Sequence, residues 1–236
     1  MSTYVLVHGA WGGAHTFHLV RPLLRAQGHE VFTPSLTGIG ERVHLASPQV
    51  CLSTHVADVV NCVLYEDLTD IVLLGFSYGG MVVSGALEHI GDRVSHLVYL
   101  DAFVPADGES VMSMNGGATP AFPLVGIGRD WLVPAAPRQF DDPAEAAFMD
   151  PRRVPHPAAC FAEPVRMPTP LDEQPFTRTY VRATAEVPDA PGTAVFERSA
   201  AHAEASPAWT LHGIATNHLI PSNRPQELAD ILLALA

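Results

Sequence analysis

A serine lies between glycines in residues 75–79, Gly-Phe-Ser-Tyr-Gly, which have the form G-x-S-x-G. The apolar run 71–74 precedes this motif and the apolar stretch 81–90 follows it. The pattern predicts a strand, a tight turn and a helix, with the hydroxyl of Ser77 lifted clear of a sheet. Ser77 is therefore a candidate nucleophile. Without the flanking strand and helix, the same glycines would indicate an ordinary turn.

A serine hydroxyl is a weak nucleophile until a base takes its proton. Of the 12 histidines, His218 is the best placed, because it follows the last predicted strand (209–212) and precedes the closing helix (225–235). This position puts it after Ser77 in chain order and at the carboxyl edge of the sheet. His218 is the candidate base, and a solvated loop histidine is the alternative interpretation.

The elements that must position these residues alternate along the chain. Apolar runs predict strands at residues 4–7, 30–33, 71–74, 97–100, 179–182 and 209–212, and amphipathic stretches predict helices at 16–27, 54–65, 81–90, 194–204 and 225–235. This alternation predicts an α/β fold with a mostly parallel sheet that helices cover on both faces. Functional groups in such sheets gather at the carboxyl ends of the strands.

The middle of the chain departs from this alternation. Fifteen of the 21 prolines lie between Pro105 and Pro191. Proline lacks the N–H that a sheet ladder needs, so the chain is too irregular to continue the sheet until the alternation resumes at about residue 176. We predict one domain over residues 1–236, with an insertion at about 106–175 laid over the main fold.

Composition excludes several classes of function. The chain of 236 residues has 13 basic and 25 acidic residues, a net charge of −12, so it would repel a phosphate backbone and nucleic acid is not an expected partner. All of the basic residues are arginines. The absence of lysine rules out a Schiff-base lysine, a P-loop lysine and a lysine general base.

Neither a membrane segment nor a bound cofactor is expected. No apolar run approaches the ~20 residues of a membrane span, and the first residues do not resemble a signal peptide, so we expect a cytoplasmic protein. No cofactor loop and no metal site is predicted, because residues 38–40 lack the third glycine of a dinucleotide loop, and His15 and His18 have no third ligand nearby. The three cysteines are widely spaced and predict free thiols in a reducing compartment: Cys51, Cys62 and Cys160.

Several stretches, taken in order, resemble α/β-hydrolases of the small esterase and hydroxynitrile-lyase group, which includes plant methyl-salicylate esterases and many bacterial esterases. They are residues 5–11, 36–42, 75–80, 99–105 and the region of His218. The resemblance spans nearly the whole chain and is weakest over 106–175, which would correspond to the family's cap. It implies a Ser-His-acid triad with Ser77 and His218. It assigns the oxyanion hole to the backbone N–H groups of Ala10 and Tyr78.

The resemblance leaves the acid of the triad open. In the family, the acid usually lies just past the strand predicted at 179–182, and the matching position carries Glu186 rather than the commoner aspartate. Asp101, at the carboxyl end of an adjacent strand, is a rival, and Asp189 is a third candidate. We rank Glu186 first, Asp101 second and Asp189 third.

Two departures from the family bear on the reaction. The lyases have a lysine next to the histidine, where this chain has Leu219, and a threonine where it has Gly9. The resemblance therefore implies hydrolysis of a carboxylic ester through an acyl-enzyme, without a cofactor. The apolar cap predicts a small to medium hydrophobic substrate rather than a polymer or a charged ester.

Other functions remain open on the same scaffold, because this fold hosts many chemistries. They are a receptor-like protein with slow turnover, a lactonase or thioesterase that uses the same triad, and a cofactor-free oxygenase. The expected partner is a small-molecule ester. A homodimer is left open.

Overall fold

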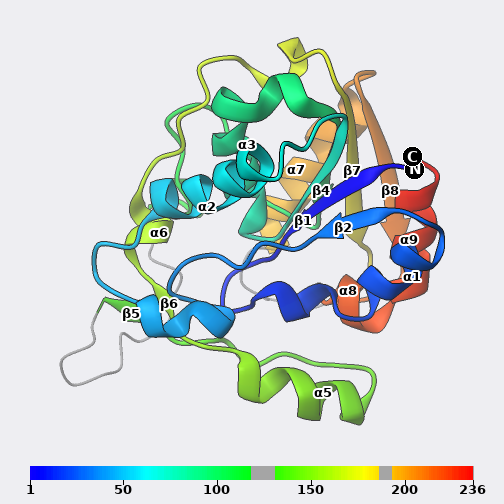
Figure 1. Cartoon of the computed structure of the whole chain (residues 1–236). Coiled ribbons are helices and arrows are strands. Elements are labelled where there is room, and N and C mark those ends of the chain that lie inside the picture. Colours follow the sequence, from blue (N-terminus) through cyan, green and yellow to red (C-terminus); the bar gives the residue numbers. More distant parts are fainter. Residues whose placement is uncertain (118–130, 186–192, 236) are drawn as a thin grey trace.

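A six-stranded sheet forms the centre of the computed structural model, which describes residues 1–117, 131–185 and 193–235 (Figure 1). Its strands are β1 (Thr3–Val7), β2 (Glu30–Phe32), β3 (Ile71–Phe76), β4 (Val94–Leu100), β7 (Thr177–Ala183) and β8 (Trp209–Ile214). They lie in the order β2-β1-β3-β4-β7-β8, and every neighbouring pair is parallel. The predicted parallel sheet is confirmed, and β3 ends directly before Ser77.

Helices cover both faces of this sheet. Side chains alternate along each strand, so in β1 Val5 and Val7 join one buried cluster while Tyr4 and Leu6 join the other. The first cluster is covered by α2 (Leu52–Tyr65), α3 (Gly79–Ile90) and α7 (Thr193–Ala205), and the second by α1 (Val20–Ala26) and α9 (Pro225–Leu233) (Figure 1). Burial on both faces explains why the strands read as continuous apolar runs.

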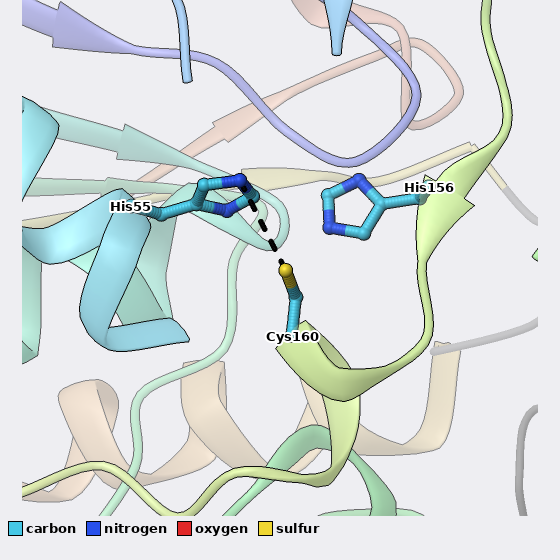
Figure 2. Close-up of side chains that lie close together, drawn as sticks. All are labelled: His55, His156 and Cys160. Carbon is cyan, nitrogen blue, oxygen red and sulfur yellow. Dashed lines mark hydrogen bonds between the residues drawn. The ribbon is translucent and has the colours of Figure 1, made fainter. Parts of the chain in front are cut away.

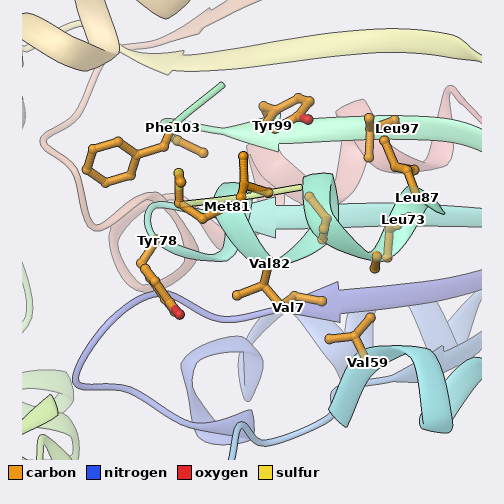
Figure 3. Packing of buried hydrophobic residues seen from close by; sticks show 14 of the residues in the cluster. Val7, Val59, Leu73, Tyr78, Met81, Val82, Leu87, Leu97, Tyr99 and Phe103 are labelled. Carbon is orange, nitrogen blue, oxygen red and sulfur yellow. The ribbon is translucent and has the colours of Figure 1, made fainter. Parts of the chain in front are cut away.

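The helix that follows Ser77 packs tightly on the middle of the sheet. Met81 and Val82 of α3 are completely buried in one cluster with Val7 and Leu73 (Figure 3). The contact is so close at Gly80 that an added Cβ would lie 2.1 Å from the carbonyl oxygen of Phe103. A glycine is needed there because the backbone after β4 occupies the place of a side chain.

We predict that Gly80→Ala destabilises the protein by about 2 kcal/mol or more, because the backbone must move to admit the methyl group. Urea unfolding followed by circular dichroism measures the change. Gly91→Ala is the matched control, since its Cβ would meet only the side-chain oxygen of Gln174, at 3.7 Å. Equal stability of the two variants would contradict the packing described here.

Among the described residues, the part of the chain between 106 and 175 contributes no strand to the main sheet. Its described elements are α4 (Val111–Met114), β5 (Leu132–Val133), α5 (Pro143–Met149), β6 (His156–Pro157) and α6 (Ala159–Ala162), with short 3₁₀ turns at Asp150–Arg152 and Leu171–Glu173. The strands β5 and β6 form an antiparallel pair of their own. The boundaries of the cap insertion, about 106–175, stay a prediction.

The predicted helix 16–27 is divided in the structure. A 3₁₀ turn covers Ala14–Phe17, and α1 begins only at Val20. Pro22 explains the late start, because proline fits the first turn of a helix and disrupts its interior. Further 3₁₀ turns at Gly40–Leu45 and Gly91–Arg93 and the short α8 (Ile220–Asn223) were not predicted. None of the described helices has the length and apolar character needed to cross a membrane.

Candidate functional site

Ser77 occupies a strained turn between β3 and α3. Its φ is 56°, in the left-handed region that residues with a side chain rarely adopt. The turn is tight, since a Cβ on Gly75 would lie 2.6 Å from the carbonyl oxygen of Gly79. The two glycines of the motif therefore permit the close approach that the strained serine requires.

His218 lies beside this serine. It follows β8 by four residues and precedes α8, and its Nε2 is 2.9 Å from Ser77 Oγ. The ring stacks on Phe76 and on Phe196, with centroid separations of 4.9 and 5.0 Å. The structure thus brings together the two residues that the sequence singled out, and adds two aromatic rings that the sequence did not single out.

The carboxylate of Asp101 is hydrogen-bonded to the other ring nitrogen of His218. The distance from His218 Nδ1 to Asp101 Oδ2 is 2.6 Å, and the second carboxylate oxygen accepts the backbone N–H of Ala183 at 3.1 Å. A carboxylate only accepts hydrogen bonds, so Nδ1 carries the proton and Nε2 is left to accept the Ser77 hydroxyl. The rival candidates Glu186 and Asp189 lie outside the described residues.

The segment after β1 lies against the serine. A Cβ on Gly9 would meet Ser77 Cβ at 2.9 Å, and Ala10 lines the same small cavity as Ser77. Tyr78 follows the serine directly and is buried. Within the described part of the chain, the backbone N–H groups of Ala10 and Tyr78 donate to no protein group. Both residues named in the sequence analysis as oxyanion donors thus flank Ser77.

A buried histidine supports this segment. His8 Nε2 accepts the backbone N–H of Leu36 at 3.1 Å, and His8 Nδ1 lies 2.9 Å from the carbonyl oxygen of Gly9. Since Nε2 accepts, Nδ1 must be the protonated nitrogen that donates to Gly9. Burial lowers the pKa of His8 to about 4, although the bond to Gly9 opposes the shift. The ring is neutral near pH 7, and each of its two nitrogens is hydrogen-bonded to a backbone group.

We predict that the free energy of unfolding falls as the pH is lowered from about 6.5 toward 4. In this window the unfolded chain binds a proton at His8 that the folded chain resists. Urea unfolding at several pH values measures the slope. In His8→Gln the slope falls by at most about 1.4 kcal/mol per pH unit, the value for one proton. An unchanged slope in His8→Gln, or the same change in the control His89→Gln at an exposed position, would contradict the assignment.

Two cavities meet at the candidate site. The smaller, of about 40 Å³, is lined by Ser77, Gly9, Ala10, Phe76, Phe140, Arg138, Arg153 and neighbouring residues. The larger, of about 550 Å³, is lined by Asp101, Phe196, Asn217, Arg138, Arg182, Glu197 and neighbouring residues. His218, Leu219 and Arg138 border both cavities. A small organic molecule in the larger cavity would therefore lie next to the histidine.

A second group of polar side chains is buried behind Tyr78. His55, His156 and Cys160 place one possible ligand atom each within 4.8 Å of the others (Figure 2). His55, however, uses both nitrogens in hydrogen bonds: Nδ1 lies 3.0 Å from the Tyr78 hydroxyl, and Nε2 lies 2.8 Å from the carbonyl oxygen of Thr37. A metal ion would have to displace these bonds. The arrangement therefore serves to hold Tyr78 in place.

The histidine pair noted in the sequence lies in one turn near the N-terminus. His18 Nδ1 is 2.9 Å from the carbonyl oxygen of His15, and its Nε2 is 3.2 Å from a carboxylate oxygen of Glu145 on α5. The ring of His18 thus links the turn near the N-terminus to α5.

Comparison with known proteins identifies the family. A profile of the Alpha/beta hydrolase family matches residues 4–231. The chain belongs to this family.

The esterase resemblance found in the sequence is confirmed by relatives of the same group. The carbendazim hydrolyzing esterase of Nocardioides sp. is 47% identical over 120 residues, 51% of this chain and 50% of that protein. Methylesterase 1 of Arabidopsis thaliana is 34% identical over 113 residues, 43% of this chain and 40% of that protein.

The chain thus spans about half the length of the first of these relatives and two fifths of the second. A solved α/β-hydrolase structure, that of a methylesterase from Arabidopsis, matches 99% of this chain and 98% of its own with a TM-score of 0.77 and 23% identity. This likeness confirms the α/β-hydrolase fold.

Proposed function

We propose that this α/β-hydrolase cleaves carboxylic esters with Ser77 as nucleophile, His218 as base and Asp101 as the acid that orients His218. The hydrogen-bonded series from Ser77 through His218 to Asp101, with distances of 2.9 and 2.6 Å beside a cavity, is the observation that carries the proposal. The names of the two relatives, an esterase and a methylesterase, support the same reaction.

In the first half of the reaction, Ser77 Oγ attacks the ester carbonyl while His218 Nε2 takes the hydroxyl proton. The negative charge on the carbonyl oxygen is received by the N–H groups of Ala10 and Tyr78. Each such donor typically contributes about 2.7–4 kcal/mol to the stabilisation of the transition state. The carbon–oxygen bond of the ester then breaks, and His218 returns the proton to the departing alcohol.

In the second half, water replaces the alcohol. His218 takes a proton from the water, whose oxygen attacks the acyl carbon. The bond from that carbon to Ser77 Oγ then breaks, His218 returns the proton to Ser77 Oγ, and the acid is released. Throughout, Asp101 keeps Nδ1 protonated and stabilises the charged imidazolium. The cavity of about 550 Å³ has room for a small to medium substrate.

The first test is release of p-nitrophenol from acetate, butyrate and octanoate esters. We expect steady turnover by the wild type and loss of essentially all of it in Ser77→Ala, because no other nucleophile replaces the hydroxyl. The profile over chain length measures the size of the acyl site. Full activity in a pure Ser77→Ala preparation would refute the proposal. A folded but inert wild type would favour the receptor-like alternative.

A second test separates the candidate acids. Asp101→Asn is expected to lower kcat by about 10³–10⁴-fold, because an amide at this place favours the wrong tautomer of His218. Glu186→Gln, the matched control, should change kcat far less. Thermal unfolding checks that both variants fold. A large loss in Glu186→Gln together with a small loss in Asp101→Asn would transfer the role to Glu186.

A further inference from the structure

Two arginines from the proline-rich segment reach the candidate nucleophile. Arg138 and Arg153 both line the small cavity that contains Ser77, and Arg138 also borders the larger cavity beside Asp101. In a chain with a net charge of −12, this is a local excess of positive charge. Neither residue is needed for the Ser77–His218–Asp101 hydrogen bonds.

Among the described residues, the charges around the cavities are paired, with one exception. Arg182 lies 3.4 Å from Glu197, and Asp101 is bonded to His218. Arg153 donates to a backbone carbonyl and lies 3.8 Å from Asp150. The guanidinium of Arg138 makes neither a hydrogen bond nor an ion pair in the described part of the chain. Within that part, the positive charge of Arg138 thus has neither a hydrogen-bond acceptor nor an anionic partner.

The surroundings of Arg138 disfavour its charged form. Its guanidinium carbon lies over the Trp11 ring, 5.9 Å from the ring centre, at a cation–π distance. Burial, and then the nearby charge of Arg153, lower the pKa of Arg138 to about 10, against the attraction of Asp101. The group is still charged near pH 7. A partly desolvated cation without an acceptor is stabilised when an anion takes up its free donors.

We propose that Arg138, with Arg153 beside it, binds a carboxylate of the substrate, so that the preferred esters are apolar esters carrying one carboxylate. Guanidinium groups suit this task because their planar donors match a carboxylate in two parallel hydrogen bonds. The proposal rests on the ester hydrolysis proposed above and narrows its substrate class. It departs from the sequence analysis, in which the apolar cap predicted a hydrophobic substrate rather than a charged ester.

The test compares two esters that differ by one group: p-nitrophenyl hexanoate and the mono-p-nitrophenyl ester of adipic acid, in which a carboxylate replaces the terminal methyl. We expect wild type to cleave the adipate ester with the higher kcat/KM, after subtraction of the Ser77→Ala blank. In Arg138→Gln the ratio of the two kcat/KM values should fall by about 10- to 100-fold, the range for a hydrogen bond to a charged group.

Two further variants separate the planar donors of Arg138 from positive charge in general. Arg138→Lys keeps the charge but not the planar donors, so it should retain part of the preference. Arg166→Gln removes the same charge from an exposed position, where Arg166 is 80% accessible and paired with Glu88. The ratio should not change in that control. High salt should weaken the preference of wild type.

The outcomes distinguish this proposal from the proposed function. Equal cleavage of both esters by wild type, or an equal loss on both in Arg138→Gln, would overturn the carboxylate site and leave ester hydrolysis standing. If neither ester is cleaved, binding of monomethyl adipate to folded wild type is measured by calorimetry. Binding that Arg138→Gln abolishes would support the carboxylate site while hydrolysis fails. Absence of binding would overturn it.

Discussion

Two backbone hydrogen bonds join the turn at Ser77 to the chain that leaves β4, and the geometry of the site depends on them. The N–H of Ser77 donates to Leu100 O at 3.1 Å, and the carbonyl oxygen of Ser77 accepts the N–H of Phe103 at 3.2 Å. Asp101 lies between these two partners. Main-chain hydrogen bonds therefore position Ser77 and Asp101 relative to each other.

The same connection explains how two strained residues can persist. Asp101 has a φ of 41°, in the left-handed region like Ser77. Such a conformation typically costs about 1–3 kcal/mol and needs surroundings that over-determine it. At Asp101 these are the bond that its N–H donates to Val181 O at 2.7 Å and the bond that its carboxylate accepts from the N–H of Ala183. The strain at both positions is balanced by contacts across β3, β4 and β7.

Much of the fold and part of the site could be predicted from the sequence, for identifiable reasons. The strands around Ser77 and His218 are buried on both faces, so apolar composition marks them, and chain order places both residues at the carboxyl edge. Asp101 was ranked below Glu186 because the acid of the resembling family usually lies just past the strand predicted at 179–182, where this chain has Glu186. In the sheet β4 lies next to β3, which puts Asp101 beside Ser77. Arg138 could not be found, since its proline-rich surroundings have no periodicity.

The stacking of His218 on Phe76 and on Phe196 restricts how the imidazole can move. Tilting out of the ring plane would disturb both stacked contacts more than a small movement within the plane. In the proposed reaction, movement within the plane would carry Nε2 from the serine oxygen toward the departing alcohol while Nδ1 stays on Asp101. Because Phe196 belongs to α7 and Phe76 to β3, the room available to the imidazole depends on the spacing between a helix and the sheet. A small shift of α7 would thus change the position of the imidazole without touching Ser77.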